Sequence, residues 1–416
     1  MTKTLDGIKM IEQFELEDKR LFLRLDLNVP FDDKGKISDE TRIQAALPTI
    51  RYAIDKGAKI VMASHLGRPK KPEDRAKFSM EPVANRLQEI LKKEILLVEE
   101  PGSDAPKALL AGLKPSQMIM LENLRFDEGE EKNSREFAQK IAAYTDIYIN
   151  DAFGASHRAH ASIVALPELI DKKGIGFLMK KEIEFIDKIK YSPEPPFLAI
   201  LGGAKVSDKI EVLEQLLESS QGIIIGGAMA FTFLAAQDIP TGSSLVERDK
   251  IKFARDILDR VKLRGKKFLL PVDHVLVKSL KEPGTNKISD GVSVPDGWMG
   301  VDIGPLTRRI YAEEIARAKT IFWNGPMGVF EVKELSAGTF AVAQAIADSD
   351  AVSVVGGGDS AAAAEASGLA DKFSHISTGG GASLEYLEGA KLPGLEAVRR
   401  QKRSEEPMEI KSQGEV

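Results

Sequence analysis

Residues 201–209, Leu201-Gly202-Gly203-Ala204-Lys205-Val206-Ser207-Asp208-Lys209, say most about the fold of this chain. The apolar run from Phe197 to Leu201 leads into two glycines, and apolar residues then recur at helical spacing from Ile210. This order predicts a strand, a tight turn and a helix. Glycines let a backbone approach a ligand closely, and the N-terminus of a helix favours an anion. We therefore expect Lys205 and Lys209 to share one face of that helix at a polyphosphate site, although the Walker A pattern is absent.

Length and composition limit the class of protein. The chain has 416 residues, which suits two large domains, and no cysteine, which excludes disulfides and thiolate metal sites. Its net charge of −5 gives no support to nucleic acid binding, so any attraction for anions must be local. The uncharged stretch 219–237 is nearly long enough to span a bilayer, but its composition favours a buried strand that runs into a helix. The N-terminus lacks a secretory signal pattern, and we expect a cytoplasmic protein without membrane or nucleic acid partners.

Apolar strands alternate with amphipathic helices along both halves of the chain. In the first half we expect strands at 20–28, 58–65, 95–99, 117–124 and 146–153, and helices at 41–56, 78–93 and 134–145. In the second half we expect strands at 197–202, 222–227, 267–277, 320–324, 351–356 and 373–377. Such alternation predicts parallel sheets covered on both faces. The fold class is therefore α/β, with two doubly wound, Rossmann-like domains.

Clustered prolines mark the boundary between these domains. The sequence Tyr191-Ser192-Pro193-Glu194-Pro195-Pro196 follows a helical pattern at 177–190. Because such prolines stop a helix and stiffen a connection, we expect an N-terminal domain at 1–176, a connecting helix at 177–190 and a C-terminal domain at 191–390. A C-terminal segment at 391–416 follows, and its charged tail from residue 399 has no apolar period.

Polar groups in the first half follow the predicted strands, where ligands of doubly wound sheets bind. The groups are Asp26-Leu27-Asn28, Ser64-His65-Leu66-Gly67-Arg68, Glu122-Asn123-Leu124-Arg125 and His157-Arg158-Ala159-His160, with Arg42 opening the helix after the first. A single surface arginine is usually only solvated. Four arginines at one sheet edge, however, predict a basic pocket for a small, doubly anionic molecule. Asp26 and Asn28 would hold its hydroxyl or carboxylate, and Arg24 either faces the pocket or supports it.

The second half adds three glycine-rich loops. They are Gly226-Gly227-Ala228, Gly356-Gly357-Gly358-Asp359-Ser360 and Gly379-Gly380-Gly381. Backbone N–H groups of such loops face anions, so together with the two lysines they favour nucleotide binding over simple tight-turn packing. Asp359 would bind a nucleotide-associated Mg²⁺, and helix N-capping with Ser360 is a compatible structural role.

Other polar groups and one rival motif complete the second half. Asn324 lies at a strand end, Glu331 is a candidate for ribose hydroxyls, and Gly300 would let a base approach the backbone. The loop from Gly356 to Ala361 also matches a dinucleotide-binding pattern, which leaves a nicotinamide dehydrogenase as the rival enzyme class. A non-catalytic nucleotide-binding scaffold is the third alternative.

Taken together, these motifs resemble the phosphoglycerate kinase family from about residue 5 to 395. The strongest matches are Arg24-x-Asp26-x-Asn28-Val29-Pro30, Ser64 to Pro69, Glu122 to Phe126, His157 to His160, Gly202 to Lys209, Trp323 to Pro326, Gly356 to Ser360 and Ser377 to Ser383. The resemblance implies reversible phosphoryl transfer between 1,3-bisphosphoglycerate and MgADP, giving 3-phosphoglycerate and MgATP in glycolysis. It also implies a monomer that closes about a hinge, with its C-terminal segment returning toward the N-terminal domain.

The resemblance implies roles for individual residues. The glycerate would be held by Asp26, Leu27, Asn28, Arg42, His65, Leu66, Gly67, Arg68, Arg125 and Arg158. The nucleotide, ATP or ADP with Mg²⁺, would be held by Lys205, Lys209, Gly300, Asn324, Glu331, Gly357, Gly358, Asp359 and Ser360, with Asp359 at the metal. Arg42, Lys205 and the backbone N–H groups of Gly357 and Gly380 would surround the transferring group. Ser360 stands where many members have threonine, a swap that keeps the hydroxyl.

Overall fold

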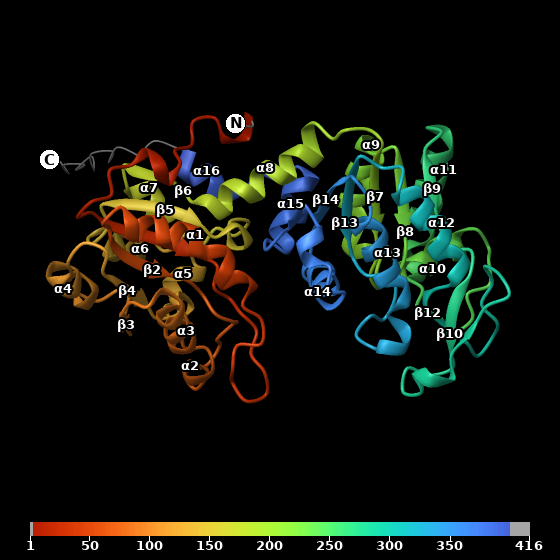
Figure 1. The fold of residues 1–416 in the computed structure, drawn as a ribbon, viewed down its shortest axis with the longest axis horizontal. Coiled ribbons are helices and arrows are strands. Elements are labelled where there is room, and N and C mark those ends of the chain that lie inside the picture. The colour runs from red at the N-terminus through yellow and green to blue at the C-terminus, as the bar shows by residue number, and fades with distance from the viewer. Residues whose placement is uncertain (1–2, 400–416) are drawn as a thin grey trace, which may run out of the picture. The chain divides into compact units, whose positions relative to one another are not determined.

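The computed structural model describes residues 3–399, and it divides into two compact units. The N-terminal unit comprises Leu5–Lys180 and the described residues after Ala390, and the C-terminal unit comprises Lys181–Ala390 and the described residues before Leu5. Figure 1 shows that each unit has its own sheet surrounded by helices. The division falls within α8 (Phe177–Tyr191), the helix that the sequence places between two domains. The predicted polar tail lies outside the described residues beyond 399.

The N-terminal unit is built on one parallel sheet of six strands. Their order across the sheet is β3-β4-β2-β1-β5-β6, and every pair in it is parallel. The strands are β1 (Arg20–Leu25), β2 (Lys59–Ala63), β3 (Ile95–Val98), β4 (Met118–Leu121), β5 (Ile147–Asp151) and β6 (Lys172–Ile175). The helices are α1 (Thr41–Asp55), α2 (Asp74–Lys77), α3 (Glu81–Leu91), α4 (Ala105–Gly112), α5 (Glu128–Glu131), α6 (Arg135–Ala142), α7 (Ala165–Leu169) and α16 (Pro393–Arg399).

Alternate residues of β1 face different layers of the N-terminal unit. Leu21, Leu23 and Leu25 belong to the core cluster that also includes residues of α1 and α3. Because strand side chains alternate with a period of two, Phe22 and Arg24 point to the opposite face, where Phe22 stacks on Tyr148 with ring centroids 5.9 Å apart. This alternation places Arg24 beneath the carboxyl edge of the sheet and fully buries it.

The C-terminal unit repeats the architecture with a second parallel sheet and adds a small antiparallel one. The strand orders are β15-β14-β13-β7-β8-β9 and β11-β10-β12. The strands are β7 (Phe197–Leu201), β8 (Gly222–Ile225), β9 (Lys267–Leu269), β10 (His274–Val277), β11 (Lys287–Ile288), β12 (Met299–Ile303), β13 (Thr320–Asn324), β14 (Val352–Val355) and β15 (His375–Ile376). The helices are α9 (Ile210–Ser219), α10 (Met229–Ala236), α11 (Ile251–Leu263), α12 (Pro305–Ile315), α13 (Ala337–Ala347), α14 (Gly358–Ala366) and α15 (Gly381–Glu388). The α/β fold class with two doubly wound parallel sheets is confirmed.

The single strand expected at 267–277 is wrong. The structure forms β9 and β10 instead, and the two belong to different sheets. Pro271 lies between them and has no N–H to donate to a ladder, so the chain leaves the parallel sheet there. The antiparallel sheet formed by β10, β11 and β12 was not anticipated.

The uncharged stretch 219–237 forms β8 followed by α10, as its composition predicts. Most of α10 is buried, which explains why it needs no polar face. Among the residues that the structure describes, no helix combines the length and apolar character needed to cross a bilayer.

Candidate functional site

The predicted polar loops of the N-terminal unit meet at one edge of its sheet. Asp26 follows β1, His65 follows β2, Glu122 follows β4 and Asp151 ends β5. These strands are parallel neighbours, so their carboxyl ends share an edge. The loops that carry the predicted polar groups therefore leave the sheet at one edge, and the sheet is drawn in Figure 1.

Hydrogen bonds fix these loops to one another. The side-chain oxygen of Asn28 accepts the backbone N–H of Gly67 at 2.7 Å, and the Ser64 hydroxyl accepts the N–H of Leu27 at 2.9 Å. The Asn123 amide donates to the carbonyl oxygen of Leu66 at 2.7 Å. Three loops that are far apart in the chain thus form one preorganised rim.

Two of the predicted arginines are held in place by partners at this rim. Arg42 Nη1 lies 2.5 Å from Oδ1 of the buried Asp26. Arg125 Nη1 donates to the Gly67 carbonyl oxygen at 2.6 Å, and its Nε lies 3.1 Å from Glu131 Oε1. Each guanidinium carries five N–H donors, so both arginines keep donors for a further acceptor.

Arg158 and Arg68 occupy the rim in different ways. Arg158 Nε donates to Nε2 of His157 at 3.0 Å. After burial, the positive charge of Arg158 also contributes to lowering the pKa of both Arg125 and His160. Arg68 is exposed on the loop that Gly67 begins. The structure therefore groups Arg42, Arg125 and Arg158 with two histidines, whereas it places Arg68 at the solvent.

Two histidines of this cluster, His65 and His160, have pKa values below the ordinary one. Burial, followed by the charge of Arg24, lowers the pKa of His65 well below its ordinary value. Burial, followed by the charge of Arg125, lowers the pKa of His160 to about 4. Both rings can therefore offer hydrogen bonds without adding positive charge at neutral pH.

Arg24 supports the pocket from beneath rather than facing it. It is fully buried, donates from Nε to the Ser162 hydroxyl at 2.8 Å, and approaches His65 Nδ1 at 3.3 Å through Nη2. It also donates to the carbonyl oxygen of Leu25. Of the two roles that the sequence left open for Arg24, the structure shows the supporting one.

In the C-terminal unit, one pocket of about 270 Å³ collects most of the predicted nucleotide residues. Two helices begin at it, because Gly357 and Gly380 are the residues that precede α14 and α15. Their φ angles of +92° and +52° are ones that residues with a side chain rarely adopt, which explains the glycines. The pocket is lined by Gly202, Gly203, Ala204, Lys205, Asp208, Lys209, Asn324, Gly325, Gly357, Gly358, Asp359, Ser360, Gly380, Gly381 and Leu384.

The two lysines do not share a helical face, and this prediction is wrong. Lys205 lies in a loop, Lys209 ends a short 3-10 turn (Ser207–Lys209), and α9 begins only at Ile210. Glu247 fixes the conformation of this loop, because its carboxylate accepts both the N–H and the hydroxyl of Ser207, at 3.1 and 2.6 Å. Both lysines nevertheless line the pocket.

Asn324 connects the two sides of this pocket. Its side-chain oxygen accepts a hydrogen bond from Lys209 Nζ, and its amide donates to the Gly356 carbonyl oxygen at 2.5 Å. Burial lowers the pKa of Lys209, while the nearby charge of Asp359 acts in the opposite sense. An anion in the pocket would favour the charged ammonium group.

The N-capping role expected for Asp359 and Ser360 is wrong. Gly357 caps α14, and no side-chain cap is present. The buried Ser360 hydroxyl instead accepts the N–H of Gly325 at 2.5 Å, so it joins two pocket loops. Asp359 is exposed and lines the pocket, where one carboxylate beside phosphate oxygens suits Mg²⁺. Within residues 3–399 no group of three acidic or histidine side chains forms a self-sufficient metal site.

Three predicted elements lie outside that pocket lining. Gly300 lies in β12, where its N–H donates to the Ser244 hydroxyl at 2.9 Å. The N–H of Val329 donates to the carbonyl oxygen of Val301 in the same strand. This bond brings the loop that carries the exposed Glu331 alongside β12. The Gly226-Gly227-Ala228 loop packs instead, with the Gly227 N–H bonded to the Met327 carbonyl oxygen. For this loop the tight-turn alternative is the one observed.

Sequence reasoning missed some lining residues. Asp208, Gly325 and Leu384 line the pocket but were not proposed as site residues. Asp208 and Gly325 each adjoin a residue that was proposed, so closer attention to those two motifs could have found them. Leu384 lies inside a helix, and no local signal marks it.

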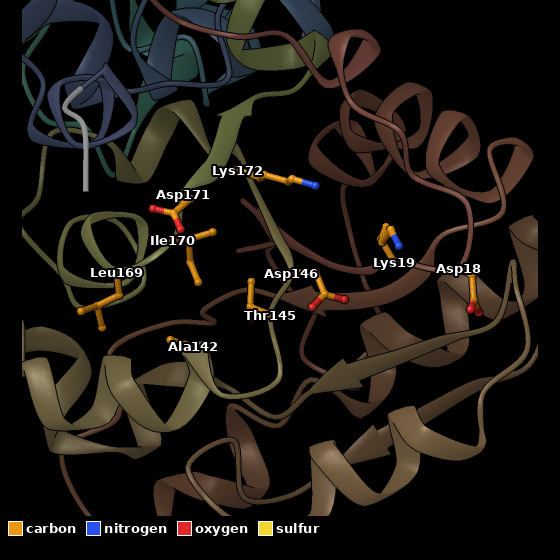
Figure 2. A pocket seen from close by; sticks show the side chains of 9 residues that line it. All are labelled: Asp18, Lys19, Ala142, Thr145, Asp146, Leu169, Ile170, Asp171 and Lys172. Atoms are coloured by element: carbon orange, nitrogen blue, oxygen red, sulfur yellow. The ribbon is translucent and has the colours of Figure 1, made fainter. Parts of the chain in front are cut away.

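A different hollow of about 530 Å³ in the N-terminal unit lies at the opposite edge of its sheet (Figure 2). Lys19 and Asp146 stand directly before β1 and β5, and Lys172 begins β6. Asp146 is bound to Arg20 at 2.5 Å. This hollow mixes acids with lysines and shares no residue with the predicted site.

The C-terminal unit has a comparable hollow where β7, β8 and β9 begin. Its basic side chains are engaged by their surroundings: Lys266 Nζ donates to three carbonyl oxygens beyond or at the end of α9, and Lys267 lies 2.8 Å from Glu314. Lys266 thus balances the C-terminus of α9 and Lys267 is paired with a carboxylate, so the hollow needs no ligand to explain these cations.

A family model described as phosphoglycerate kinase matches residues 11–390. A phosphoglycerate kinase of Bdellovibrio bacteriovorus is 59% identical over 399 residues, covering 96% of this chain and 99% of the relative. One of Anaeromyxobacter dehalogenans is 53% identical over 392 residues, covering 94% and 99%. Among solved structures, phosphoglycerate kinases of Coxiella burnetii and Pyrococcus horikoshii match with TM-scores of 0.84 and 0.83 at 38% and 36% identity, each covering 94% of this chain and 98% of the other.

Proposed function

This chain belongs to the phosphoglycerate kinase family, and we propose that it transfers a phosphoryl group between 1,3-bisphosphoglycerate and MgADP with the residues described above. It is a phosphotransferase of glycolysis. In the direction of ATP synthesis, a β-phosphate oxygen of ADP attacks the acyl phosphate. The bond between phosphorus and the acyl oxygen breaks, and a carboxylate leaves. Nucleophile and leaving group are both already anionic, so no proton has to move.

The nucleotide pocket carries this proposal. Two helix N-termini and two lysines converge there on a space lined by bare glycine backbone. Helix N-termini and backbone N–H groups stabilise phosphate oxygens, and lysines add charge. Lys205, Lys209, Asn324, Gly357, Gly358 and Ser360 hold the phosphates in this proposal, with Asp359 at Mg²⁺ and Gly300 and Glu331 beside the nucleoside.

The glycerate belongs on the N-terminal unit. The arginine and histidine cluster offers forked donors for a phosphate and neutral rings for further hydrogen bonds. Asp26 and Asn28 hold the hydroxyl or carboxylate, and the substrate set is completed by Leu27, Leu66, Gly67, Arg68, Arg125 and Arg158. Each of these residues belongs to the N-terminal unit.

Catalysis then rests on alignment and charge. The transferring group carries charge on three equatorial oxygens, which Arg42, Lys205 and the N–H groups near Gly357 and Gly380 neutralise in this proposal. Because the two substrates belong to different units, the units must close for transfer to occur.

A coupled assay with 3-phosphoglycerate and MgATP tests the function. We expect formation of 1,3-bisphosphoglycerate, which a reducing partner enzyme converts with consumption of NADH. NADH consumption that needs no partner enzyme would support the dehydrogenase alternative, and nucleotide binding without turnover would support the scaffold.

A further inference from the structure

Two adjacent carboxylates of α5 contact the arginine cluster in different ways. Glu130 is fully buried and accepts the N–H and the hydroxyl of Ser162 at 2.9 and 2.6 Å, while that same hydroxyl accepts Arg24 Nε. Glu131 instead leaves its side chain 55% exposed and reaches Arg125 Nε at 3.1 Å. Glu130 therefore belongs to the buried support, whereas Glu131 stands at the open rim.

Glu131 forms an ion pair with Arg125, with 3.1 Å between its Oε1 and Arg125 Nε. A guanidinium binds an anion best through a fork, with either the Nε and Nη2 pair or the Nη1 and Nη2 pair. The Glu131 carboxylate lies near Nε but makes no hydrogen bond with it, whereas the Gly67 carbonyl oxygen accepts a hydrogen bond from Nη1 at 2.6 Å. The negative charge of Glu131 thus offsets part of the Arg125 charge, and the Gly67 carbonyl oxygen already uses one of the arginine's terminal N–H donors. The Gly67 contact is part of the fixed rim, whereas the Glu131 side chain, being half exposed, can swing into solvent.

We propose that Glu131 is a specificity-determining residue, a resident competitor for Arg125 that only an anion with several other contacts displaces. This inference rests on the proposed function of the site. The glycerate substrate carries a phosphate and a carboxylate and would meet several rim residues at once, so it can release Glu131. A small inorganic anion has a single charged centre. Its contact with Arg125 therefore does not compensate for breaking the ion pair between Arg125 and Glu131. Glu131 thereby keeps sulfate and phosphate out of a pocket whose arginines would otherwise attract them.

The chain offers a matched control on the same turn. Glu128 is also acidic and exposed, but it pairs with Lys132 at 2.6 Å and touches no arginine of the cluster in the described structure. Glu128→Gln and Glu131→Gln change the net charge equally. A difference between the two variants therefore reports the local contact with Arg125 and not the overall charge.

The test measures steady-state KM for 3-phosphoglycerate and the inhibition constant for sulfate. In Glu131→Gln we expect the sulfate constant to fall about three- to tenfold, as expected for removing one charge at a few ångströms in a wet site, and KM for 3-phosphoglycerate to fall less. KM for MgATP and both constants of Glu128→Gln should match the wild type. A sulfate constant that rises or stays the same in Glu131→Gln would overturn the proposal, because a purely structural contact would loosen Arg125 and weaken every anion.

A second measurement separates this inference from the proposed function. Calorimetric titration with sulfate reads anion affinity without turnover. A wild-type chain that fails to act on 3-phosphoglycerate would refute the function. Tighter sulfate binding by Glu131→Gln would still support the competitor role, and unchanged or weaker binding would refute that role by itself.

Discussion

Among single residues, Arg42 has the largest expected effect on catalysis. It opens α1 at the carboxyl edge of the sheet, and Asp26 holds its guanidinium in place. Arg42→Ala should lower kcat by about 10³–10⁵, the range that one well-placed cation contributes to phosphoryl transfer. Ser360→Thr keeps the hydroxyl that accepts the Gly325 N–H, so it should change kcat little. Steady-state rates of both variants give the test, and comparable rates would contradict the role of Arg42.

At the scale of elements, the contact between β12 and α13 should make stability depend on pH. Asp302 at the end of β12 is almost fully buried, and its carboxylate accepts the N–H of Gly338 in the first turn of α13 at 2.6 Å. Burial raises the pKa of Asp302 to about 7, although Arg308 lies 3.5 Å away. The folded state therefore binds a proton that the unfolded state has lost between about pH 4 and pH 7. Its stabilising contribution is complete below about pH 4 and is lost as pH rises through 7.

Urea unfolding at several pH values tests this expectation. Both tryptophans, Trp298 and Trp323, lie in the C-terminal unit, so their fluorescence reports its unfolding. The free energy of unfolding of the wild type relative to Asp302→Asn should decline from pH 5 to pH 8. If the free energies of unfolding of the wild type and of Asp302→Asn change in parallel with pH over this range, Asp302 does not titrate there.

Elements with strong apolar patterns were predictable, and those defined by distant contacts were not. The strand at 320–324 is recovered to the residue, because a buried parallel strand needs a continuous apolar run. The strand β6 was missed because it begins Lys172-Lys173, although Lys173 is buried and its Nζ donates to the Pro167 carbonyl oxygen at 2.7 Å. The loop before α9 depends on Glu247, 40 residues away, which no local pattern reveals.

For the whole molecule, the division into two units predicts independent binding of the two substrates. Lys209 belongs to the C-terminal unit and Arg125 to the N-terminal unit. Lys209→Ala should weaken MgADP binding by about tenfold, the effect of about 1.4 kcal/mol, and leave 3-phosphoglycerate binding unchanged. Arg125→Ala should weaken 3-phosphoglycerate binding and leave MgADP binding unchanged, because sites without shared partners behave additively. Calorimetric titrations of both ligands into both variants give the test, and a cross-effect of similar size would contradict the assignment of one substrate to each unit.

Phosphoryl transfer between ligands on separate units also predicts a change of shape. The reacting atoms must come within about 3–3.5 Å, and water must be excluded from the transferring group. Neither ligand alone meets this requirement, so the radius of gyration should fall when both substrates are present and change little with either one. Small-angle scattering of the free protein, the two binary complexes and the ternary complex measures this directly. The Lys209→Ala variant at the same ligand concentrations is the control, because weaker nucleotide binding should reduce the compaction. An unchanged radius in the wild-type ternary complex would mean that transfer does not proceed through closure.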